Sequence, residues 1–209
     1  MGPLATSSRN RGHLANEDPV LATLSTRHSQ ADPFKWDVYD RTGEDRFRVL
    51  AFLTIGQVVT QRVAAEQYDN LTRIADEPLG ADGVIRLATD GLTDAGIAKF
   101  KVTAHLALAS AIIEDRIDLD ELDELEDEEI CHLLTAIPGI GRWAVELILI
   151  RGLQRPDVLP ASDHGIKRAI QRAWGLPALS GAAETDAPAD CWRPYRSFAA
   201  ALMWASLST

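Results

Sequence analysis

Apolar residues recur at helical spacing along most of the chain after residue 45. Between Arg46 and Leu71 they include Phe47, Leu50 and Leu53, spaced so that they share one face of a helix, and the segment predicts a helical hairpin or one long helix. Alternation with period two, which is typical of a half-buried strand, is nearly absent. The pattern predicts an all-α fold. The other helices it predicts lie at 97–113, 128–136, 142–151, 164–174 and 194–207.

Breaks in this pattern suggest how the chain is organised. Loops are expected at 77–83, 152–162 and 177–189, where glycine, proline and small residues gather. A length of 209 residues suits one compact domain or two lobes that share a core. We expect an N-terminal segment, 1–45, packed on the C-terminal lobe. A helical domain, 46–175, follows, and a loop with a closing helix, 176–209, completes the second lobe.

Cysteine content and the N-terminus limit the class of protein. Cys131 and Cys191 lie far apart with no CxxC pair, which excludes a cysteine-based zinc site and a four-cysteine iron–sulfur cluster. Residues 1–16 are small and polar without an apolar signal core, and no later run of about 18 apolar residues could span a membrane. These features predict a protein of the reducing cytoplasm with no membrane partner.

The net charge of −10 argues at first against a nucleic-acid partner. The excess is local, however, because residues 114–129 hold eleven Asp/Glu against Arg116 alone. The rest of the chain carries 20 acidic and 20 basic residues. Residues 142–172 hold six Lys/Arg against three Asp/Glu, enough to build a DNA-facing surface. We interpret the acidic run as a solvated helix or linker, with an acidic interaction segment as the alternative.

The stretch LLTAIPGIGRWAVELILIRG (133–152) is the most specific pattern in the chain. A helix should end shortly before Pro138, and a short turn should reverse the chain into an apolar helix that begins at Arg142. Gly139 and Gly141 allow unusual torsions and leave no Cβ in the way, so amides at the start of the second helix could contact a phosphate. The alternative is an ordinary turn between two helices.

Asp163 follows the second hairpin glycine by twenty-two residues, within VLPASDHGIKRAIQRAWG (158–175). Its place before the expected helix 164–174 is that of an N-cap, a common structural use of aspartate. A carboxylate this close in sequence to a phosphate-binding hairpin is unusual, because it would repel DNA. Cleavage of an N-glycosidic bond builds positive charge on the sugar, which an ionised carboxylate stabilises. Asp163 is therefore the candidate catalytic residue.

The IPGIG hairpin, the apolar helix after it and the LPASDHGIKRA segment resemble the helix-hairpin-helix (HhH-GPD) DNA glycosylases. PGIGRW, LTIGQVVTQRVAAEQYDNL and the closing WRPYRSFAAALMW are most similar to the AlkA-type 3-methyladenine DNA glycosylases II. The resemblance covers about residues 46–207. It implies a two-lobed helical fold and base excision repair of alkylated bases such as 3-methyladenine and 7-methylguanine in double-stranded DNA. The lesion itself stays open.

The chain departs from the family pattern in ways that narrow this expectation. Trp143 stands where bifunctional relatives carry a nucleophilic lysine, so water rather than a Schiff base is expected, which makes the enzyme monofunctional. Residues 1–45 leave no room for the N-terminal β-domain of longer AlkA proteins. Val58 replaces the second glutamine of the family's GQQ run, which helps to fill the gap left in DNA, so that role could pass to Gln57 or Gln61.

The resemblance and the chemistry of the lesion together suggest further site residues. A positively charged alkylated base favours stacking on aromatic faces, and the pocket candidates are Trp143, Trp36, Phe47 and Trp192, each with a core role as its alternative. Leu92, in an expected GLTDAG turn (91–96), is the candidate wedge inserted where the base leaves the stack, and Asp94 is the alternative if the loop register differs. The residues expected to contact DNA are Gly139, Ile140, Gly141, Arg142, His164, Lys167, Gln57 and Leu92.

The resemblance also implies a structural Na⁺ or K⁺ at the hairpin. Its ligands would be the main-chain carbonyls of Thr135, Ile137 and Ile140, and no other cofactor is expected. We expect a monomer in the cytoplasm, associated with a bacterial nucleoid. Two competing functions stay open: a non-catalytic DNA-binding or damage-recognition module, and a bifunctional glycosylase for oxidised bases.

Overall fold

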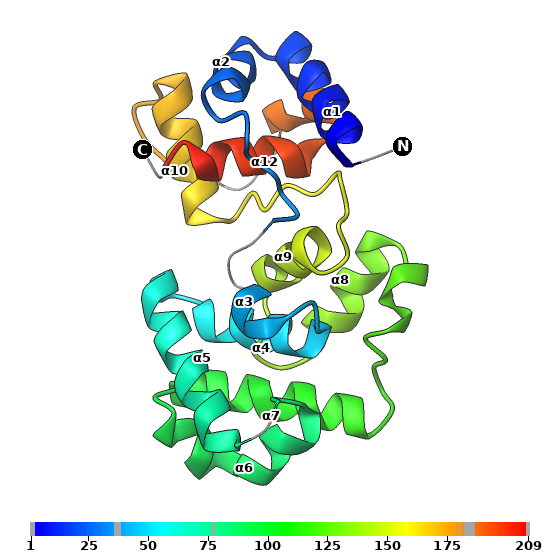
Figure 1. The fold of residues 1–209 in the computed structure, drawn as a ribbon, viewed down its shortest axis with the longest axis vertical. Helices are drawn as coiled ribbons and strands as arrows, with labels where there is room; N and C mark the ends of the chain where they lie inside the picture. Colours follow the sequence, from blue (N-terminus) through cyan, green and yellow to red (C-terminus); the bar gives the residue numbers. More distant parts are fainter. Residues whose placement is uncertain (1–2, 36–38, 77, 180, 182–186, 208–209) are drawn as a thin grey trace. The chain divides into compact units, whose positions relative to one another are not determined.

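The computed structural model describes residues 3–35, 39–76, 78–179, 181 and 187–207. These residues form helices and turns without a strand (Figure 1), so the all-α expectation is confirmed. Contacts divide the chain into unit 1, residues 1–35 with 154–209, and unit 2, residues 36–153. Residues 154–175, which the loop pattern grouped with the central helices, make their contacts within unit 1. No described helix is both long and apolar enough to cross a membrane.

Unit 2 is built around α4, which is buried on almost every side. All of its residues from Phe47 to Ile55 are buried except Arg48, because α5, α7 and α9 pack around it. The segment 46–71 is therefore a helical hairpin and not one long helix. The elements of unit 2 are α3 (Tyr39–Thr42), α4 (Arg46–Gly56), α5 (Gln61–Ala75), α6 (Ala81–Asp94), α7 (Lys99–Ile113), η1 (Glu121–Glu124), α8 (Asp127–Thr135) and α9 (Arg142–Arg151).

A buried lysine ties α7 to the end of α4. Lys101 is 2 % exposed, and its Nζ donates to the Ile55 carbonyl oxygen at 2.6 Å. Burial lowers the pKa of the Lys101 amine. The Ile55 carbonyl is one of the last of α4 and lacks a helical partner, so the ammonium completes the helix just before the chain turns at Gln57.

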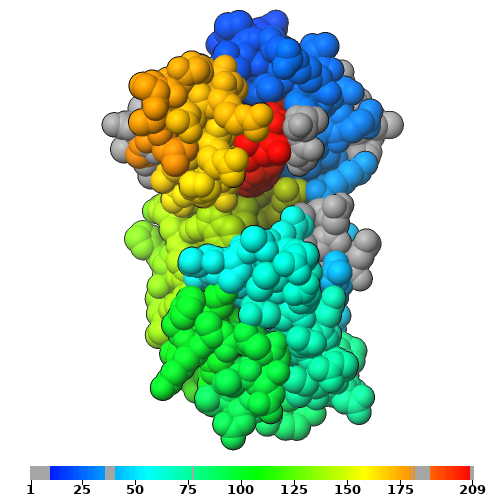
Figure 2. Space-filling view, turned by 90° about the vertical axis from the view of Figure 1, so that its left-hand side faces the viewer, coloured from blue at the N-terminus to red at the C-terminus, as the bar shows by residue number. Residues whose placement is uncertain are grey.

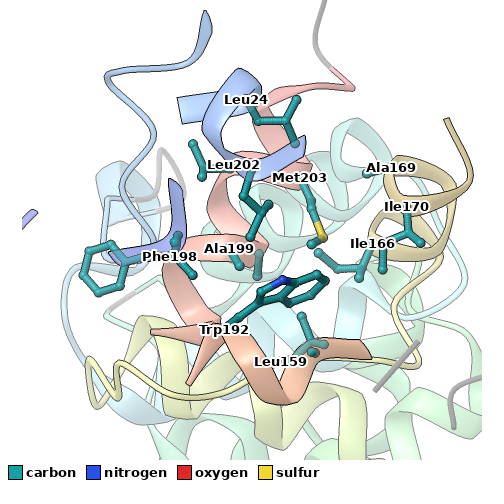
Figure 3. Packing of buried hydrophobic residues seen from close by; sticks show 14 residues of the cluster. Leu24, Leu159, Ile166, Ala169, Ile170, Trp192, Phe198, Ala199, Leu202 and Met203 are labelled. Atoms are coloured by element: carbon teal, nitrogen blue, oxygen red, sulfur yellow. The ribbon is translucent and has the colours of Figure 1, made fainter. Parts of the chain in front are cut away.

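Unit 1 packs the two ends of the chain around Trp192 (Figure 3). Its indole is 1 % exposed and lies among Leu159, Ile166 and residues of the closing helix. The elements of unit 1 are α1 (Pro3–Glu17), α2 (Pro19–Arg27), α10 (His164–Trp174), η2 (Ala187–Trp192) and α12 (Arg196–Ala205). Helices α1, α2 and α6 lie outside the predicted pattern. The 164–174 and 142–151 helices have the predicted bounds.

Candidate functional site

The hairpin between α8 and α9 is a tight turn anchored by two isoleucines. Ile137 and Ile140 are each 4 % exposed, and the Ile140 N–H donates to the Ile137 carbonyl at 3.1 Å. The residues between and after them, Pro138, Gly139 and Gly141, are exposed. The two isoleucines thus fix the turn in the core of unit 2 and leave the residues between and after them exposed.

Glycine stands at positions 139 and 141 of the turn for different physical reasons. Gly139 has φ +88°, and a Cβ there would lie 2.6 Å from the Ala104 Cβ of α7. Gly141 has φ −91°, an ordinary value, and a Cβ there would meet nothing within 4 Å. Gly139 is therefore required by the fold, whereas the fold does not require a glycine at Gly141.

Gly141 is also the N-cap of α9, and no side chain caps that helix end. The first amides of a helix lack intrahelical acceptors and carry partial positive charge. At Gly141 they open onto an exposed surface with no Cβ in front of them. This arrangement suits an approaching anion such as a phosphate.

Arg142, the first residue of α9, is engaged by acidic neighbours. Its guanidinium donates to Glu128 at 3.4 Å and to Glu146 at 3.0 Å. Hydrogen bonds to Glu128 and then Glu146 raise the pKa of Arg142 above its ordinary value. A phosphate contact by this side chain would have to compete with these ion pairs.

The structure brings Gln57 to the hairpin. The Gln57 side-chain amide donates to the Gly139 carbonyl at 3.3 Å, so the loop between α4 and α5 contacts the glycine turn. The next residue, Val58, is 95 % exposed and has φ +61°. A β-branched residue in this left-handed region is strained, and strain of this kind gathers at functional sites. Gln61 is exposed at the start of α5.

Val58 is a candidate functional residue that the sequence analysis treated only as a missing glutamine. The sequence did carry a sign of this role, because the apolar Val58 replaces a polar glutamine in the GQQ run. Its exposure and its backbone conformation could not be read from the pattern.

The wedge candidate Leu92 needs correction. It lies in the last turn of α6, where an open turn was expected, and it is 0 % exposed in the core of unit 2. A side chain buried in this way could not insert into DNA without leaving the core. The alternative, Asp94, is exposed at the end of the same helix.

In unit 1, Asp163 is the N-cap of α10 and is half-buried. Its Oδ1 accepts the Ile166 N–H at 2.8 Å and the Trp204 indole Nε1–H at 3.0 Å. Two donors on one carboxylate oxygen fix the orientation of the group. Trp204 is forty-one residues away in sequence, and its contact with Asp163 was not anticipated.

A glycine makes space for this carboxylate. A Cβ at Gly165 would lie 2.9 Å from Asp163 Oδ1 and 3.3 Å from Trp204 Cδ1. The "DHG" of the sequence motif thus records a steric need, because any larger residue would push the carboxylate or the indole away.

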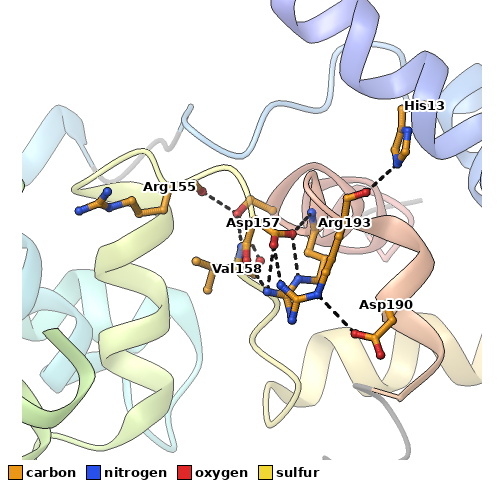
Figure 4. Close-up of polar contacts among 8 residues, drawn as sticks. His13, Arg155, Asp157, Val158, Asp190 and Arg193 are labelled. Carbon is orange, nitrogen blue, oxygen red and sulfur yellow. Dashed lines mark hydrogen bonds and ion pairs between the residues drawn. The ribbon is translucent and has the colours of Figure 1, made fainter. Parts of the chain in front are cut away.

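The loop that leads to Asp163 is fastened to the start of α12 (Figure 4). Asp157 accepts from Arg196 Nε at 2.8 Å and from Arg193 at 2.7 Å. Ser197 accepts the Val158 N–H at 3.0 Å and donates to the Arg155 carbonyl at 2.7 Å. Together with Trp204 near the other end, α12 holds the loop at both ends.

The aromatic candidates do not all occupy similar places. Trp143 is half-buried in the first turn of α9. Phe47 is 8 % exposed in the core of unit 2, and Trp192 is a core residue of unit 1 that donates its indole N–H to Asp18 at 3.1 Å. Phe47 and Trp192 therefore have the core role that was the alternative to a place in the pocket. Trp36 lies outside the described residues.

The two remaining DNA candidates follow Asp163 on α10. His164 is exposed and Lys167 is half-buried. The predicted residues therefore fall into two groups, the hairpin with Gln57 in unit 2 and Asp163 with its neighbours in unit 1.

Two of the curated proteins that this chain resembles are described as DNA-3-methyladenine glycosylases. A putative DNA-3-methyladenine glycosylase of Bacillus subtilis is 32% identical over 124 residues, 59% of this chain and 43% of the relative. DNA-3-methyladenine glycosylase 1 of Schizosaccharomyces pombe is 34% identical over 110 residues, 52% of this chain and 48% of the relative. The matches thus span less than half of these relatives. No family model matches the sequence.

The fold has a close counterpart among solved structures. The 3-methyladenine DNA glycosylase of S. pombe, solved with abasic DNA, has a TM-score of 0.86 with this chain. The match covers 96% of this chain and 97% of that one at 22% identity. This likeness confirms the expected glycosylase fold.

Proposed function

We propose that the chain is a helix-hairpin-helix DNA glycosylase, AlkA-like in sequence, and that it acts as a monofunctional DNA glycosylase for alkylated bases. The observation that carries the proposal is the carboxylate of Asp163, held on one oxygen by two N–H donors. It follows a hairpin whose exposed glycine turn suits a phosphate.

The carboxylate has a defined part in hydrolysis. As the bond between C1′ and the base nitrogen breaks, its electron pair leaves with the base and positive charge develops on the sugar. An ionised Asp163 stabilises that charge, and the oxygen of a water molecule forms the new bond to C1′ while its proton passes to the carboxylate or to solvent. An alkylated base leaves as a neutral species, which weakens the bond before any enzyme acts.

Trp143 supports both halves of the proposal. It supplies no amine for a Schiff base, which favours water as the nucleophile. Its half-buried ring in the first turn of α9 could stack on a cationic base.

The hairpin could also hold a monovalent cation. The Thr135 carbonyl cannot accept a hydrogen bond from the residue three positions on, because Pro138 has no N–H. The Ile137 carbonyl accepts one hydrogen bond, from Ile140, and keeps a second lone pair. These carbonyls and that of Ile140 fit Na⁺ or K⁺, which would offset phosphate charge at the turn. The monomeric state and the cytoplasmic, nucleoid-associated location stay predictions.

The function is tested by base release. Methylated duplex DNA is incubated with the protein, and free 3-methyladenine and 7-methylguanine are quantified by chromatography beside etheno adducts. Release without strand cleavage, and without a covalent adduct after borohydride, is the expected result. Binding without release would favour the non-catalytic module, and a trapped adduct would favour the bifunctional enzyme.

We propose that Val58, and not Leu92, fills the gap left in DNA when the base is extruded. Val58→Gly removes the side chain and relieves the strain at φ +61°. We expect the free energy of unfolding to rise by about 1 kcal/mol. We also expect single-turnover base release from duplex DNA to fall on the order of tenfold, because no side chain then offsets the free-energy cost of unstacking the damaged base.

The opposite signs of these two effects separate insertion from a folding defect. Thermal unfolding and base release are measured on the same preparations. Leu92→Ala is the control, expected to lower stability through its buried cavity. Unchanged base release by Val58→Gly would rule out the insertion role.

Trp204 is proposed to position Asp163. Trp204→Phe keeps an aromatic ring and removes only the indole N–H on Asp163 Oδ1. A lost hydrogen bond to a charged group costs about 1.5–3 kcal/mol, so base release should fall about tenfold to a hundredfold. Trp174→Phe, in the same core, is the matched control and should leave the rate unchanged. Equal rates for the two variants would contradict the positioning role.

A further inference from the structure

The two units differ in charge in a way that the whole-chain value hides. Unit 1 holds ten Lys/Arg and eight Asp/Glu, whereas unit 2 holds eleven Lys/Arg and twenty-three Asp/Glu. The net charge of unit 2 opposes a polyanion, so DNA contacts there would be confined to the glycine turn and the adjoining loop of Gln57 and Val58. Unit 1 is the part of the chain that could offer it extended basic surface.

One face of α10 concentrates this positive charge. His164, Arg168 and Arg172 follow one another at intervals of four residues, so they share the side of α10 opposite the buried Ile166 and Ile170, and the half-buried Lys167 borders that side. The helix contains no Asp or Glu. In Figure 2 the chain near residue 170, yellow to orange, lies at the surface of unit 1.

The basic face continues at the end of α10 into a pocket of about 460 Å³. Arg172 meets Arg27 and His28 from the end of α2 there, beside Ser206. Leu24, with Ala169 and Ala173, supplies its apolar lining, and no acidic residue lines it.

The arginines of unit 1 differ in whether their side chains form ion pairs. Arg193 and Arg196 form ion pairs with Asp157 and fasten the loop before Asp163. Arg27, Arg168 and Arg172 make no ion pair or hydrogen bond within the described part of the chain. The helix dipole favours Arg27 and Arg172 in their last turns, but it does not account for Arg168 in the middle of α10.

We propose that the α10 basic face, through Arg168 and Arg172, and Arg27 of the adjoining pocket bind backbone phosphates of duplex DNA that flanks the damaged base. The inference rests on the proposed function, because it takes the damaged nucleotide to lie at Asp163, where α10 begins. It adds a second, side-chain-based DNA contact to the backbone-based contact of the hairpin.

The geometry of α10 sets the length of DNA that the contact needs. Arg172 lies eight residues after His164, about 12 Å along the helix axis. This corresponds to roughly three to four base pairs of duplex. A duplex with fewer flanking pairs on that side could not reach the basic face.

The experiment measures duplex affinity against salt concentration for wild type, Arg172→Ala and Arg168→Ala/Arg172→Ala. Each lost phosphate contact should make the slope of log K against log salt shallower by about 0.9. Arg168→Lys/Arg172→Lys should restore the slope, because the charge is kept. Arg73→Ala, an exposed arginine in the last turn of α5, is the control and should match wild type.

A second arm repeats the measurement with two lesion duplexes, each cut to two flanking pairs on one side only, so that the long arm keeps the DNA double-stranded. On the duplex that is shortened on the α10 side, wild type and the double variant should have equal slopes, and single-turnover base release at saturating protein should be the same for both. If wild type binds and processes DNA but the double variant has the wild-type slope on long duplex, the α10 basic face is not a DNA contact. If wild type neither binds duplex nor releases bases, the proposed function fails as well.

Discussion

Replacing Asp163 by asparagine is expected to lower base release from methylated duplex DNA by about 10²–10³-fold, the usual cost of removing a group that stabilises transition-state charge. Asparagine keeps the shape of the side chain and is as good an N-cap as aspartate. Its carbonyl oxygen can still accept from Ile166 and Trp204. What is lost is the negative charge that opposes the developing charge on the sugar.

DNA affinity and stability should move little, or affinity should rise, since a charge that repels phosphate is removed. Single-turnover base release, thermal unfolding and duplex binding check the three expectations on one protein preparation.

Unit 1 contains a close structural match to Asp163 that serves as control. Asp18 is the N-cap of α2, is half-buried like Asp163, and accepts both backbone amides and the indole N–H of Trp192. An aspartate with a cap role and an indole donor can therefore be purely structural. Asp18→Asn should release bases at the wild-type rate. Similar losses for both variants, or none for either, would show that Asp163 is a second structural cap.

The predictable parts of the fold are those whose sequence pattern is local. Helix α10 begins at an Asp cap and ends before Gly175, which has φ +65°, so both of its ends are marked in the sequence. Helix α1 has few apolar residues, and the burial of Leu14 depends on partners from the other end of the chain. Helix α6 contains two glycines and an interruption at Ala88, φ +52°, which hide its helical spacing.

The residues of the candidate site also differ in whether a local sequence pattern marks them. The hairpin and Asp163 could be found because each lies within a short, specific motif. Trp204 could not be assigned, because its partner is forty-one residues away and the indole could equally have been core. Leu92 was misplaced because an expected turn is the last turn of α6, which carries the side chain inward.

The two hairpin glycines should separate folding from DNA binding. Gly139→Ala forces a Cβ to 2.6 Å from Ala104 at φ +88°, so it should lower the free energy of unfolding by about 1–3 kcal/mol. Gly141→Ala has open space and an ordinary φ, and its stability should change by less than about 1 kcal/mol. Thermal unfolding measures this difference.

Gly141→Ala, which should change stability little, is expected to weaken DNA binding. The Cβ that meets no protein atom at Gly141 would stand in front of the α9 amides, where a phosphate must come close. The loss of one hydrogen bond to a charged group costs about 1.5–3 kcal/mol, which would weaken duplex binding about tenfold to a hundredfold. Fluorescence anisotropy at temperatures where both variants are folded measures this loss of DNA affinity separately from any loss of stability. Wild-type affinity for Gly141→Ala would mean that the phosphate does not approach the start of α9, and the hairpin would then be an ordinary turn between two helices.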